Sequence, residues 1–338
     1  MPRNAPRPKL ADVARLSGLS LTTVSMVLND RPDTRISEAA RAKVLASAKQ
    51  LNYRPNMSAQ ALKTTRTKMI GFISDEVATT RFASGLIRGA LNEASKLGYL
   101  LLVMETGGDF DLEQEAFDVL SDRQVDQVIF ASMRARESIL PKISARTRVV
   151  MLNATNAKHP LTVLPDEFAG GQLAANAVAA KSAGQHIALI GKNRRVEESI
   201  FDSITIPRRL AGMKEVLKSQ GAKLEVEVET VDWNPQDGYE ATLNLLRSRS
   251  DITTLICMND RLAFGAYQAI AELGLQIPED VKVVSFDDDE IAQHLKPGLT
   301  TVALPHEEMG AEAVRLLMSD QNTGSVLVPM RLVKRESI

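Results

Sequence analysis

The pattern of hydrophobic and polar positions predicts two short helices near the start of the chain. Apolar residues recur at helical spacing over Leu10–Leu16, and the polar turn Ser17–Ser20 then interrupts them. Within this turn, Gly18 can adopt the left-handed conformation that ends a helix, and Ser20 can cap the helix that follows. The second helix, Leu21–Leu28, would direct its two valines and its last leucine inward.

The other side of this second helix is available to a partner. It carries Leu21, Thr22, Ser25, Met26 and Asn29. Two helices joined by a tight turn, the second with such a face, are typical of a helix-turn-helix, whose second helix enters the major groove of DNA. These residues alone leave open a packed α-helical corner that binds no DNA.

A third helix is predicted over Glu38–Leu51, with Ser37 as its N-cap and Asn52 as a left-handed residue at its end. Three helices of this size bury little surface, so the head would be marginally stable by itself. Met57–Leu62 could add one or two helical turns. So short a helix would need DNA or a second copy of the chain to order it.

From Met69 onward, short β-rich segments alternate with amphipathic helices. The expected strands are Met69–Ser74, Tyr99–Glu105, Gln127–Ala131, Val149–Asn153, Ile187–Gly191, Glu225–Val231, Thr254–Met258, Val281–Asp287 and Thr301–Ala303. The expected helices are Ala83–Leu97, Glu113–Asp122, Ala169–Ala183, Ile206–Gln220, Pro235–Arg249, Asp260–Leu273 and Glu307–Met318. This alternation predicts doubly wound parallel sheets with helices on both faces.

Nine strands are many for one sheet, and a second series starts near residue 165, so we expect two α/β lobes. The first would comprise residues 69–164 and 304–325, and the second residues 165–303 and 326–338. With the helix-turn-helix domain at 1–55 and a hinge helix and linker at 56–68, the chain would have three parts. The carboxyl ends of the strands, where ligands bind in open α/β sheets, would face one another across a cleft.

The charge distribution separates the head from the rest of the chain. The net charge is −1, but residues 1–68 contain 13 Lys and Arg against 4 Asp and Glu, which leaves 28 against 38 for the remainder. A basic head on an acidic body indicates that the head binds a polyanion.

Composition also narrows the class of protein. The single cysteine, Cys257, lies in an apolar segment and is expected to be a buried strand thiol. The N-terminus lacks the apolar core of a secretory signal, and no apolar run is long enough to span a membrane. We therefore expect a cytoplasmic protein without a membrane partner.

Four residues at the ends of expected strands or the starts of helices are candidates for ligand binding. They are Asn259, Asp287, Arg209 and Trp233. Together they offer an amide, a carboxylate, a guanidinium and an aromatic face, which suits a polyhydroxylated ligand such as a sugar. Taken singly, Asp260 could instead be the N-cap of a helix, and Arg209 could be solvated.

The sequence gives little support for catalysis, a metal or a cofactor. A glycine-rich phosphate loop is absent from the sequence, and His159, His186, His294 and His306 lack metal-binding spacing. The acidic segment Asp287–Glu290 lacks the glycine and distal glutamate of a calcium loop. We therefore expect no enzyme, no cofactor and no metal site.

The head carries the pattern DVA-x-x-(A/S)-G-(V/L)-S-x-x-TVS-x-VLN over Asp12–Asn29, and the segment Pro55–Leu62 carries the pattern PN-x-x-A-x-x-L. Further motifs lie at Ile70–Gly71, Arg209–Gly212, Asn259–Ala266, Val284–Asp288, Leu299–Val302 and Arg335–Ser337. With these motifs in this order, the whole chain resembles the LacI/GalR family of bacterial transcriptional regulators.

The resemblance implies a sequence-specific DNA-binding transcriptional regulator, a repressor, which binds a pseudo-palindromic operator as a homodimer. It implies that Leu21, Thr22 and Met26 reach bases in the major groove and that Leu62 is wedged into the minor groove. The candidate DNA contacts are Leu21, Thr22, Ser25, Met26, Asn29, Ala59 and Leu62. A small sugar or sugar-derived effector would bind between the lobes. The candidate effector contacts are Arg209, Asp287, Asn259, Trp233, His306, Asn153 and Ser74.

Three departures from the family pattern affect specificity. Met26 stands where the family usually has a polar residue, and it cannot make a bidentate contact to guanine. The loop Asp30–Arg35 is about two residues longer than in many members, and His306 stands where an aromatic residue often lines the pocket. No leucine heptads follow Ile338, which favours a dimer over a tetramer.

Two other classes of protein have to be distinguished from a regulator. A solute-binding protein would share the two-lobed body, but the basic head and the missing signal segment argue against it. A sugar-processing enzyme with an added DNA-binding head would show a product in an activity assay. The sequence does not indicate whether the effector is an inducer or a corepressor.

Overall fold

The computed structural model describes residues 8–28, 36–53, 67–80, 83–179, 186–192, 203–322 and 324–338. The chain divides into two compact units, Met1–Thr67 and Lys68–Ile338, which are called the head and the core. Among the described residues, no helix combines the length and the apolar character needed to cross a bilayer.

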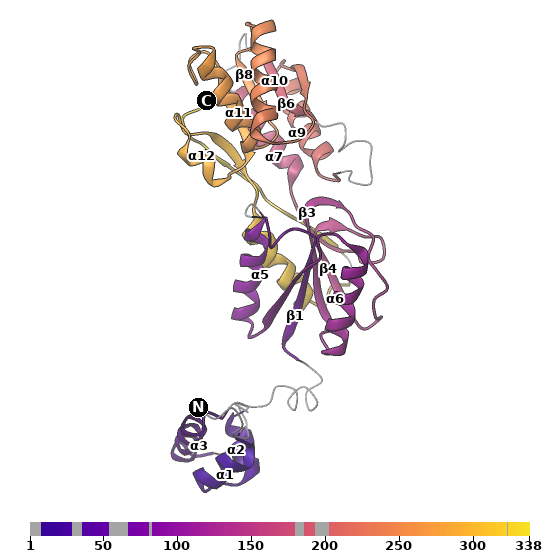
Figure 1. Ribbon diagram of the computed structural model, residues 1–338, viewed down its shortest axis with the longest axis vertical. Coiled ribbons are helices and arrows are strands. Elements are labelled where there is room, and N and C mark those ends of the chain that lie inside the picture. Colours follow the sequence, from indigo (N-terminus) through magenta and orange to yellow (C-terminus); the bar gives the residue numbers. More distant parts are fainter. Residues whose placement is uncertain are drawn as a thin grey trace. The chain divides into compact units, whose positions relative to one another are not determined.

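The described part of the head contains three helices, which pack around a small apolar core (Figure 1). They are α1 (Leu10–Ser17), α2 (Leu21–Leu28) and α3 (Glu38–Gln50). Val13, Val24, Val27 and Val44 are buried between them, each from the inner face of its helix. Leu16 is largely exposed instead, because it lies about 200° around the helix from the buried Ala14.

The expected helix ends in the head are confirmed. Gly18 ends α1 with φ of 69°, and the hydroxyl of Ser20 accepts a hydrogen bond of 3.1 Å from the amide of Thr23 at the start of α2. Ser37 caps α3 in the same way, and Asn52 has φ of 47°. These local signals therefore set the boundaries of the helix-turn-helix.

Within its described residues, the core contains two sheets of six strands each. The first sheet comprises β1 (Met69–Ser74), β2 (Leu100–Glu105), β3 (Gln127–Glu137), β4 (Arg148–Thr155), β5 (Leu161–Pro165) and β11 (Gly324–Val328), in the order β11-β5-β4-β3-β1-β2. The second comprises β6 (Ile187–Lys192), β7 (Leu224–Glu229), β8 (Thr254–Cys257), β9 (Lys282–Asp287), β10 (Thr300–Ala303) and β12 (Arg331–Val333), in the order β12-β10-β9-β8-β6-β7. We call the half of the core built on each sheet the first and the second lobe.

Helices cover the sheets. The first lobe contains α5 (Ser84–Lys96), α6 (Phe110–Asp122) and α13 (His306–Met318). The second contains α7 (Glu167–Ala179), α9 (Ile206–Ser219), α10 (Pro235–Ser248), α11 (Asp260–Glu272) and the short α12 (Glu290–His294). Because each sheet reverses its strand order once, right-handed crossovers place helices on both of its faces.

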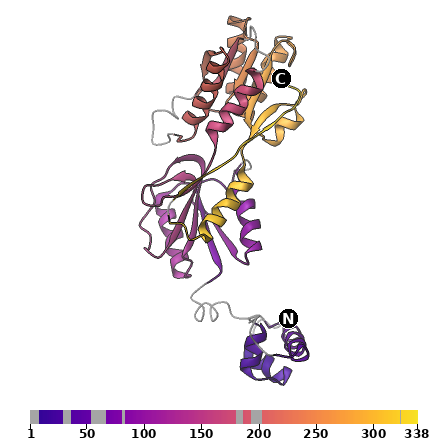
Figure 2. The same ribbon diagram turned by 180° about the vertical axis from the view of Figure 1, so that it is seen from behind.

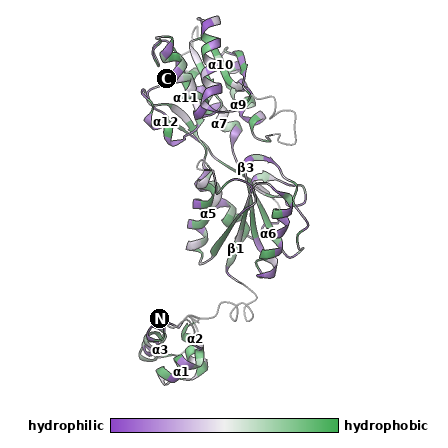
Figure 3. Ribbon diagram, in the orientation of Figure 1, coloured by the Kyte–Doolittle hydropathy of each residue, from purple (hydrophilic) through white to green (hydrophobic). Residues whose placement is uncertain are grey.

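The packing of the first lobe agrees with this rule. Leu86 of α5 and Met309 of α13 share one apolar cluster, and Phe117 of α6 belongs to another with the opposite face of the sheet. Figure 2 shows α13 beside α5 although more than two hundred residues separate them, and Figure 3 shows the largely hydrophobic strands around β1.

The expected two-lobed, mainly parallel α/β architecture is confirmed, with strands that the pattern did not indicate. These are β5, β11 and β12. β11 is the edge strand of the first sheet and pairs with β5, and β12 pairs antiparallel with β10. The chain passes between the lobes after β5, between β10 and α13, and between β11 and β12. Since β11 runs to Val328 within the first sheet, the last passage lies at Pro329–Met330, a few residues after the expected position.

Glycine contacts bring α7 and α9 of the second lobe unusually close. A Cβ atom on Gly171 would lie 2.0 Å from the carbonyl oxygen of Arg209, and one on Gly212 would lie 2.0 Å from that of Phe168. Side chains larger than hydrogen cannot fit at these positions. This approach places the first residues of both helices, Glu167 and Arg209 among them, against each other.

Candidate DNA interface and effector cleft

The outer face of α2 is open in the head. Leu21 is 52% exposed, Thr22 is exposed, and Ser25 and Met26 are half-buried. Val24 on the opposite face is fully buried, which fixes the rotation of the helix. The remaining candidate DNA contacts, Asn29, Ala59 and Leu62, lie outside the described residues.

Two cavities in the described part of the core contain candidate effector residues. The larger, cavity 1, has a volume of about 570 Å³ and includes Asp287 and His306 in its lining. It contacts Gly85 of the first lobe and the passages between the lobes at Leu304–Pro305 and Pro329. Cavity 2 has a volume of about 300 Å³ and lies within the second lobe beside Trp233.

Arg209 is buried in the second lobe and bound to Glu167. Its Nε and Nη2 atoms donate to the two carboxylate oxygens of Glu167 at 2.6 and 2.7 Å, and Nη1 donates to the carbonyl of Met258 at 2.7 Å. Both side chains of the pair are 3% exposed, and the guanidinium carbon lies 4.1 Å from the ring centroid of Phe286. The residue is thus neither solvated nor open to a ligand in this conformation.

Asp287 ends β9 with a left-handed backbone, φ of 112°. Burial raises the pKa of its carboxyl well above the usual range, as does the nearby charge of Asp260, whereas Arg209 opposes the shift. Asp260 is itself buried and accepts hydrogen bonds from Thr301 at 2.8 Å and from the amide of Asp289 at 2.7 Å. Asp260 therefore holds the segment after β9 in place, and Asp287 lines the cavity.

Trp233 and Asn259 are joined to each other. The indole nitrogen of Trp233 donates to the carbonyl of Gly191 at 2.7 Å, and the amide of Asn259 donates to the carbonyl of Trp233 at 3.2 Å. The side-chain oxygen of Asn259 accepts from the amide of Leu262 at 2.8 Å, so Asn259 is the N-cap of α11. The capping role that was expected of Asp260 therefore belongs to Asn259, one residue earlier.

The two candidates from the first lobe are both engaged in internal hydrogen bonds. Ser74 donates to Glu105 at 2.8 Å, and Asn153 donates to the carbonyls of Ser132 and Met133 at 2.9 and 3.0 Å. Both side chains are buried, and neither is in the lining of cavity 1 or cavity 2. The structure thus brings Asp287 and His306 to one cavity and Trp233 to another, and it does not gather all seven candidates around one space.

The roles of two buried acidic residues, Asp75 and Glu167, were not predicted from the sequence. Asp75, directly after β1, accepts from Ser132 at 2.7 Å, from the amide of Met133 at 2.8 Å and from Arg136 at 3.3 Å. This cluster lies where the strand order of the first sheet reverses, between β1 and β3. The rule that polar residues follow strands would have found it one residue beyond Ser74.

Glu167 was missed because the helix containing it was expected to begin at Ala169, two residues too late. An acidic residue at a helix start has an ordinary explanation in the helix dipole, so the sequence carried no signal of its partner.

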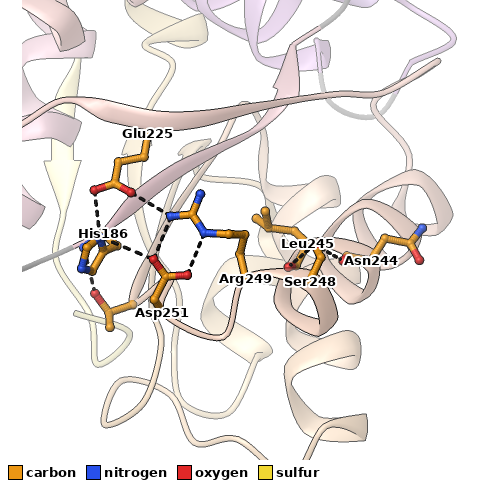
Figure 4. A network of polar contacts seen from close by, with 8 residues as sticks. His186, Glu225, Asn244, Leu245, Ser248, Arg249 and Asp251 are labelled. Atoms are coloured by element: carbon orange, nitrogen blue, oxygen red, sulfur yellow. Dashed lines mark hydrogen bonds and ion pairs between the residues drawn. The ribbon is translucent and has the colours of Figure 1, made fainter.

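One further cluster has the residue types of a metal site (Figure 4). Among the described residues, His186, Glu225 and Asp251 bring one potential ligand atom each to within 4.8 Å of one another. Arg249 donates to Glu225 at 2.9 Å and to both oxygens of Asp251 at 2.7 and 2.8 Å. The guanidinium thereby supplies the positive charge that these carboxylates would otherwise take from a metal, so the cluster is an ion-pair network.

Comparison with known proteins finds relatives over nearly the whole length of the chain. Residues 9–56 match the lacI family of bacterial regulatory proteins, and residues 181–338 match a periplasmic binding protein-like domain. The HTH-type transcriptional regulator RegA of Clostridium saccharobutylicum is 31% identical over 332 residues, 97% of each chain. The ribose operon repressor of Escherichia coli K12 is 30% identical over 313 residues, 91% of this chain and 92% of that protein.

Solved structures give the same result. The lac repressor dimer bound to operator and the anti-inducer ONPF matches with a TM-score of 0.75 and 25% identity, over 98% of this chain and 99% of that one. A LacI-family transcriptional regulator from Enterococcus faecium with bound ribose matches with a TM-score of 0.60 and 25% identity, over 80% and 98%. The relatives are transcription regulators and not enzymes. The helix-turn-helix, the two-lobed core and these full-length relatives show that the chain belongs to the lacI family of bacterial regulatory proteins, as a DNA-binding transcriptional regulator controlled by an effector.

Proposed function

We propose that this regulator is a cytoplasmic homodimeric repressor that binds a pseudo-palindromic operator and responds to a small sugar or sugar-derived effector in cavity 1. The observation that carries the proposal is that this cavity contacts both lobes and two of the passages between them. A ligand there would bind one relative position of the lobes better than another. Such a difference in affinity is what a ligand needs to shift a conformational equilibrium.

On DNA, Leu21, Thr22, Ser25, Met26 and Asn29 would face the major groove, with the basic head supplying phosphate contacts. The hinge segment would place Ala59 and Leu62 in the minor groove. Two copies are needed because one three-helix head presents little surface and few base contacts.

The first lobe offers an apolar surface for a second copy of the chain. Leu91 of α5 is 44% exposed, and Leu97 and Leu100 beside it are also exposed. Leu97 precedes β2 and Leu100 begins it, and β2 lies at the edge of its sheet. An exposed group of leucines next to an unpaired strand edge is typical of a protein interface.

Two relatives support a carbohydrate as the effector. The ribose operon repressor has a sugar in its name, and the regulator from Enterococcus faecium was solved with ribose bound. Within cavity 1, carboxylates such as Asp287 can accept hydrogen bonds from sugar hydroxyls. His306 could provide a ring face or a further hydrogen bond.

The test is a fluorescence-anisotropy titration of the full-length protein on a candidate operator, with and without added sugars. The affinity should fall steeply with salt, with a slope near −0.9 for each phosphate that is neutralised. Leu62→Ala should weaken operator binding more than binding to unrelated DNA. An affinity independent of salt, or an equal loss on both DNAs, would contradict the proposed binding mode.

A further inference from the structure

We infer that α2 recognises thymine by its methyl group, and that Leu21 and Met26 contact the C5-methyl groups of two thymines in each half-site of the operator. The inference rests on the proposed function, which places this helix in the major groove of DNA. It deepens that proposal by naming the chemistry of the bases that the helix selects.

The packing of the head determines which side of α2 is open. Val24 is 0% and Val27 is 3% exposed, and both belong to the apolar core of the head. Successive residues of a helix are about 100° apart, so Thr22 and Met26 lie one turn apart on the side away from these valines. Leu21 lies beside this pair at the start of the helix and is 52% exposed. Leu21 and Met26 therefore both belong to the face that the helix would present to base edges.

This face offers no ionic or amide group. None of the eight residues of α2, all of which the structure describes, is charged or has a side-chain amide. Arg and Lys recognise guanine by paired hydrogen bonds, Asn and Gln recognise adenine in the same way, and Asp or Glu accepts from cytosine. The next amide along the chain, Asn29, comes after the helix and lies outside the described residues. The side chains of α2 therefore have to distinguish bases by other contacts.

Hydroxyl and apolar contacts remain. The hydroxyl of Thr22 discriminates little between bases, because it can either donate or accept a hydrogen bond. An apolar side chain instead contacts the C5-methyl group, which thymine alone among the four bases projects into the major groove. Leu21 has no polar side-chain atom, and the thioether sulfur of Met26 is only a weak acceptor. Thymine is therefore the base that these two side chains can distinguish.

Position rather than exposure identifies Leu21 as a base contact. Leu45 of α3 is 50% exposed, nearly as much as Leu21, and single exposed leucines are common on protein surfaces. Leu21, however, is the first residue of the second helix of a helix-turn-helix, and the N-terminal residues of that helix contact base edges. Contact with a methyl group would remove the apolar surface of both partners from water. Leu45 provides a matched control for this reasoning.

The start of α2 is fixed within the head itself. The hydroxyl of Ser20 accepts from the amide of Thr23 at 3.1 Å, and the hydroxyl oxygens of these two residues are 2.8 Å apart. Leu21, between them, therefore meets DNA from a defined position. Met26 has an unbranched, flexible side chain, which can adjust to the place of its methyl group.

The experiment begins with operator DNA that the full-length protein selects from duplexes of random sequence. In the selected duplex, each thymine is replaced in turn by deoxyuridine, which lacks only the C5-methyl group and keeps the same base pair. Each replacement is made in both half-sites, so that the two heads of a dimer are affected alike. The affinity is measured by fluorescence anisotropy at one salt concentration, because the phosphate contacts depend on salt.

We expect two thymines of each half-site to be sensitive, with a loss in affinity of about threefold to fivefold per methyl group, which is about 0.6–1 kcal/mol. A loss of this size corresponds to the burial of one methyl group. At the same two positions, 5-methylcytosine should bind more tightly than cytosine, because it restores the methyl group at the same place in the groove. Binding to unrelated DNA should not depend on these groups.

Two variants connect each methyl group to its side chain. In Leu21→Ala, deoxyuridine at one sensitive position should no longer reduce the affinity, whereas the other position stays sensitive. Met26→Ala should show the reverse pattern. Leu45→Ala removes a similarly exposed leucine from α3 and should retain both sensitivities. The deoxyuridine scan of the unmodified protein tests methyl recognition independently of how well any variant folds.

The outcomes separate this inference from the proposed function. If the selection enriches no sequence, sequence-specific binding is wrong and methyl recognition fails with it. If a sequence is enriched but deoxyuridine weakens binding at no position, the protein binds a specific operator without reading thymine methyl groups. If both sensitivities persist in Leu21→Ala and in Met26→Ala, another part of the chain reads the methyl groups, and the assignment to α2 is overturned.

Discussion

The buried pair of Arg209 and Glu167 permits a quantitative test of how the second lobe is held together. The perturbations are Glu167→Gln, Arg209→Met and the double variant. Each single change removes one charge and leaves the other in a site that is 3% exposed. The double change removes both charges and retains most of the side-chain volume.

Breaking a buried ion pair from one side costs about 3–5 kcal/mol, because the remaining charge has lost its partner. Arg209 would keep its hydrogen bond to Met258, which places Glu167→Gln at the lower end of this range. Replacing both partners by uncharged side chains is far less costly than the sum of the two single changes. We expect an interaction energy of about 2–3 kcal/mol between the positions.

The assay is guanidinium denaturation followed by the fluorescence of Trp233, the single tryptophan of the chain, which lies in the same lobe. The exposed pair of Arg247 and Glu272, 3.2 Å apart in this lobe, is the matched control and should contribute less than about 1 kcal/mol. A double variant that loses the full sum of the two single losses would refute the reasoning. So would single variants as mild as those of the control pair.

Three further predictions concern stability and assembly. Glu113 is 5% exposed, and burial raises its pKa to about 7. The folded state therefore holds this proton more tightly than the unfolded state, and the free energy of unfolding falls as the pH rises from about 4.5 to 7. Glu113→Gln should remove this loss and raise the free energy of unfolding at pH 8 by up to about 3 kcal/mol in denaturation curves; an unchanged pH dependence would contradict it. Gly212→Ala should cost about 1–3 kcal/mol in the same assay by forcing α7 and α9 apart, while the exposed Lys218→Ala on α9 should cost little. Leu91→Glu should shift the protein from dimer to monomer in sedimentation velocity, and a dimer of unchanged strength would place the interface elsewhere.

In the head, local sequence signals were sufficient to predict where the helices end and begin. The turn around Gly18 and the cap at Ser20 were predictable because a helix end depends on a few adjacent residues. The alternation of strands and helices was equally clear, since burial on both faces demands continuous apolar strands. β12 was not found because three residues on an antiparallel edge have no distinctive pattern.

The candidate site was harder to predict, because its geometry depends on partners far apart in the chain. Arg209 was placed correctly at a helix start, but its partner Glu167 lies 42 positions earlier, and only the packing of α7 on α9 brings them together. Asn259 was a candidate ligand contact, and its cap to Leu262 is a local role that was expected one residue later, at Asp260. Residue type therefore indicated which side chains are polar and buried, but not what they bind.

The buried ion pair changes how a loss of effector response should be interpreted. If Arg209→Ala abolished the response, this would be expected of a ligand contact, but it would equally be expected of a second lobe destabilised by an unpaired Glu167. Asp287→Asn is a cleaner probe, because Asp287 lines cavity 1 and because burial and the nearby Asp260 raise the pKa of its carboxyl. If the response required Arg209 to touch the effector, the effector would have to compete with Glu167 for the guanidinium. The response would then weaken in parallel with the stability of the pair, and Glu167→Gln would strengthen effector binding. If Arg209 only positions the segment around Asp287, Glu167→Gln would weaken binding instead, and the sign of that one change distinguishes a contact from a support.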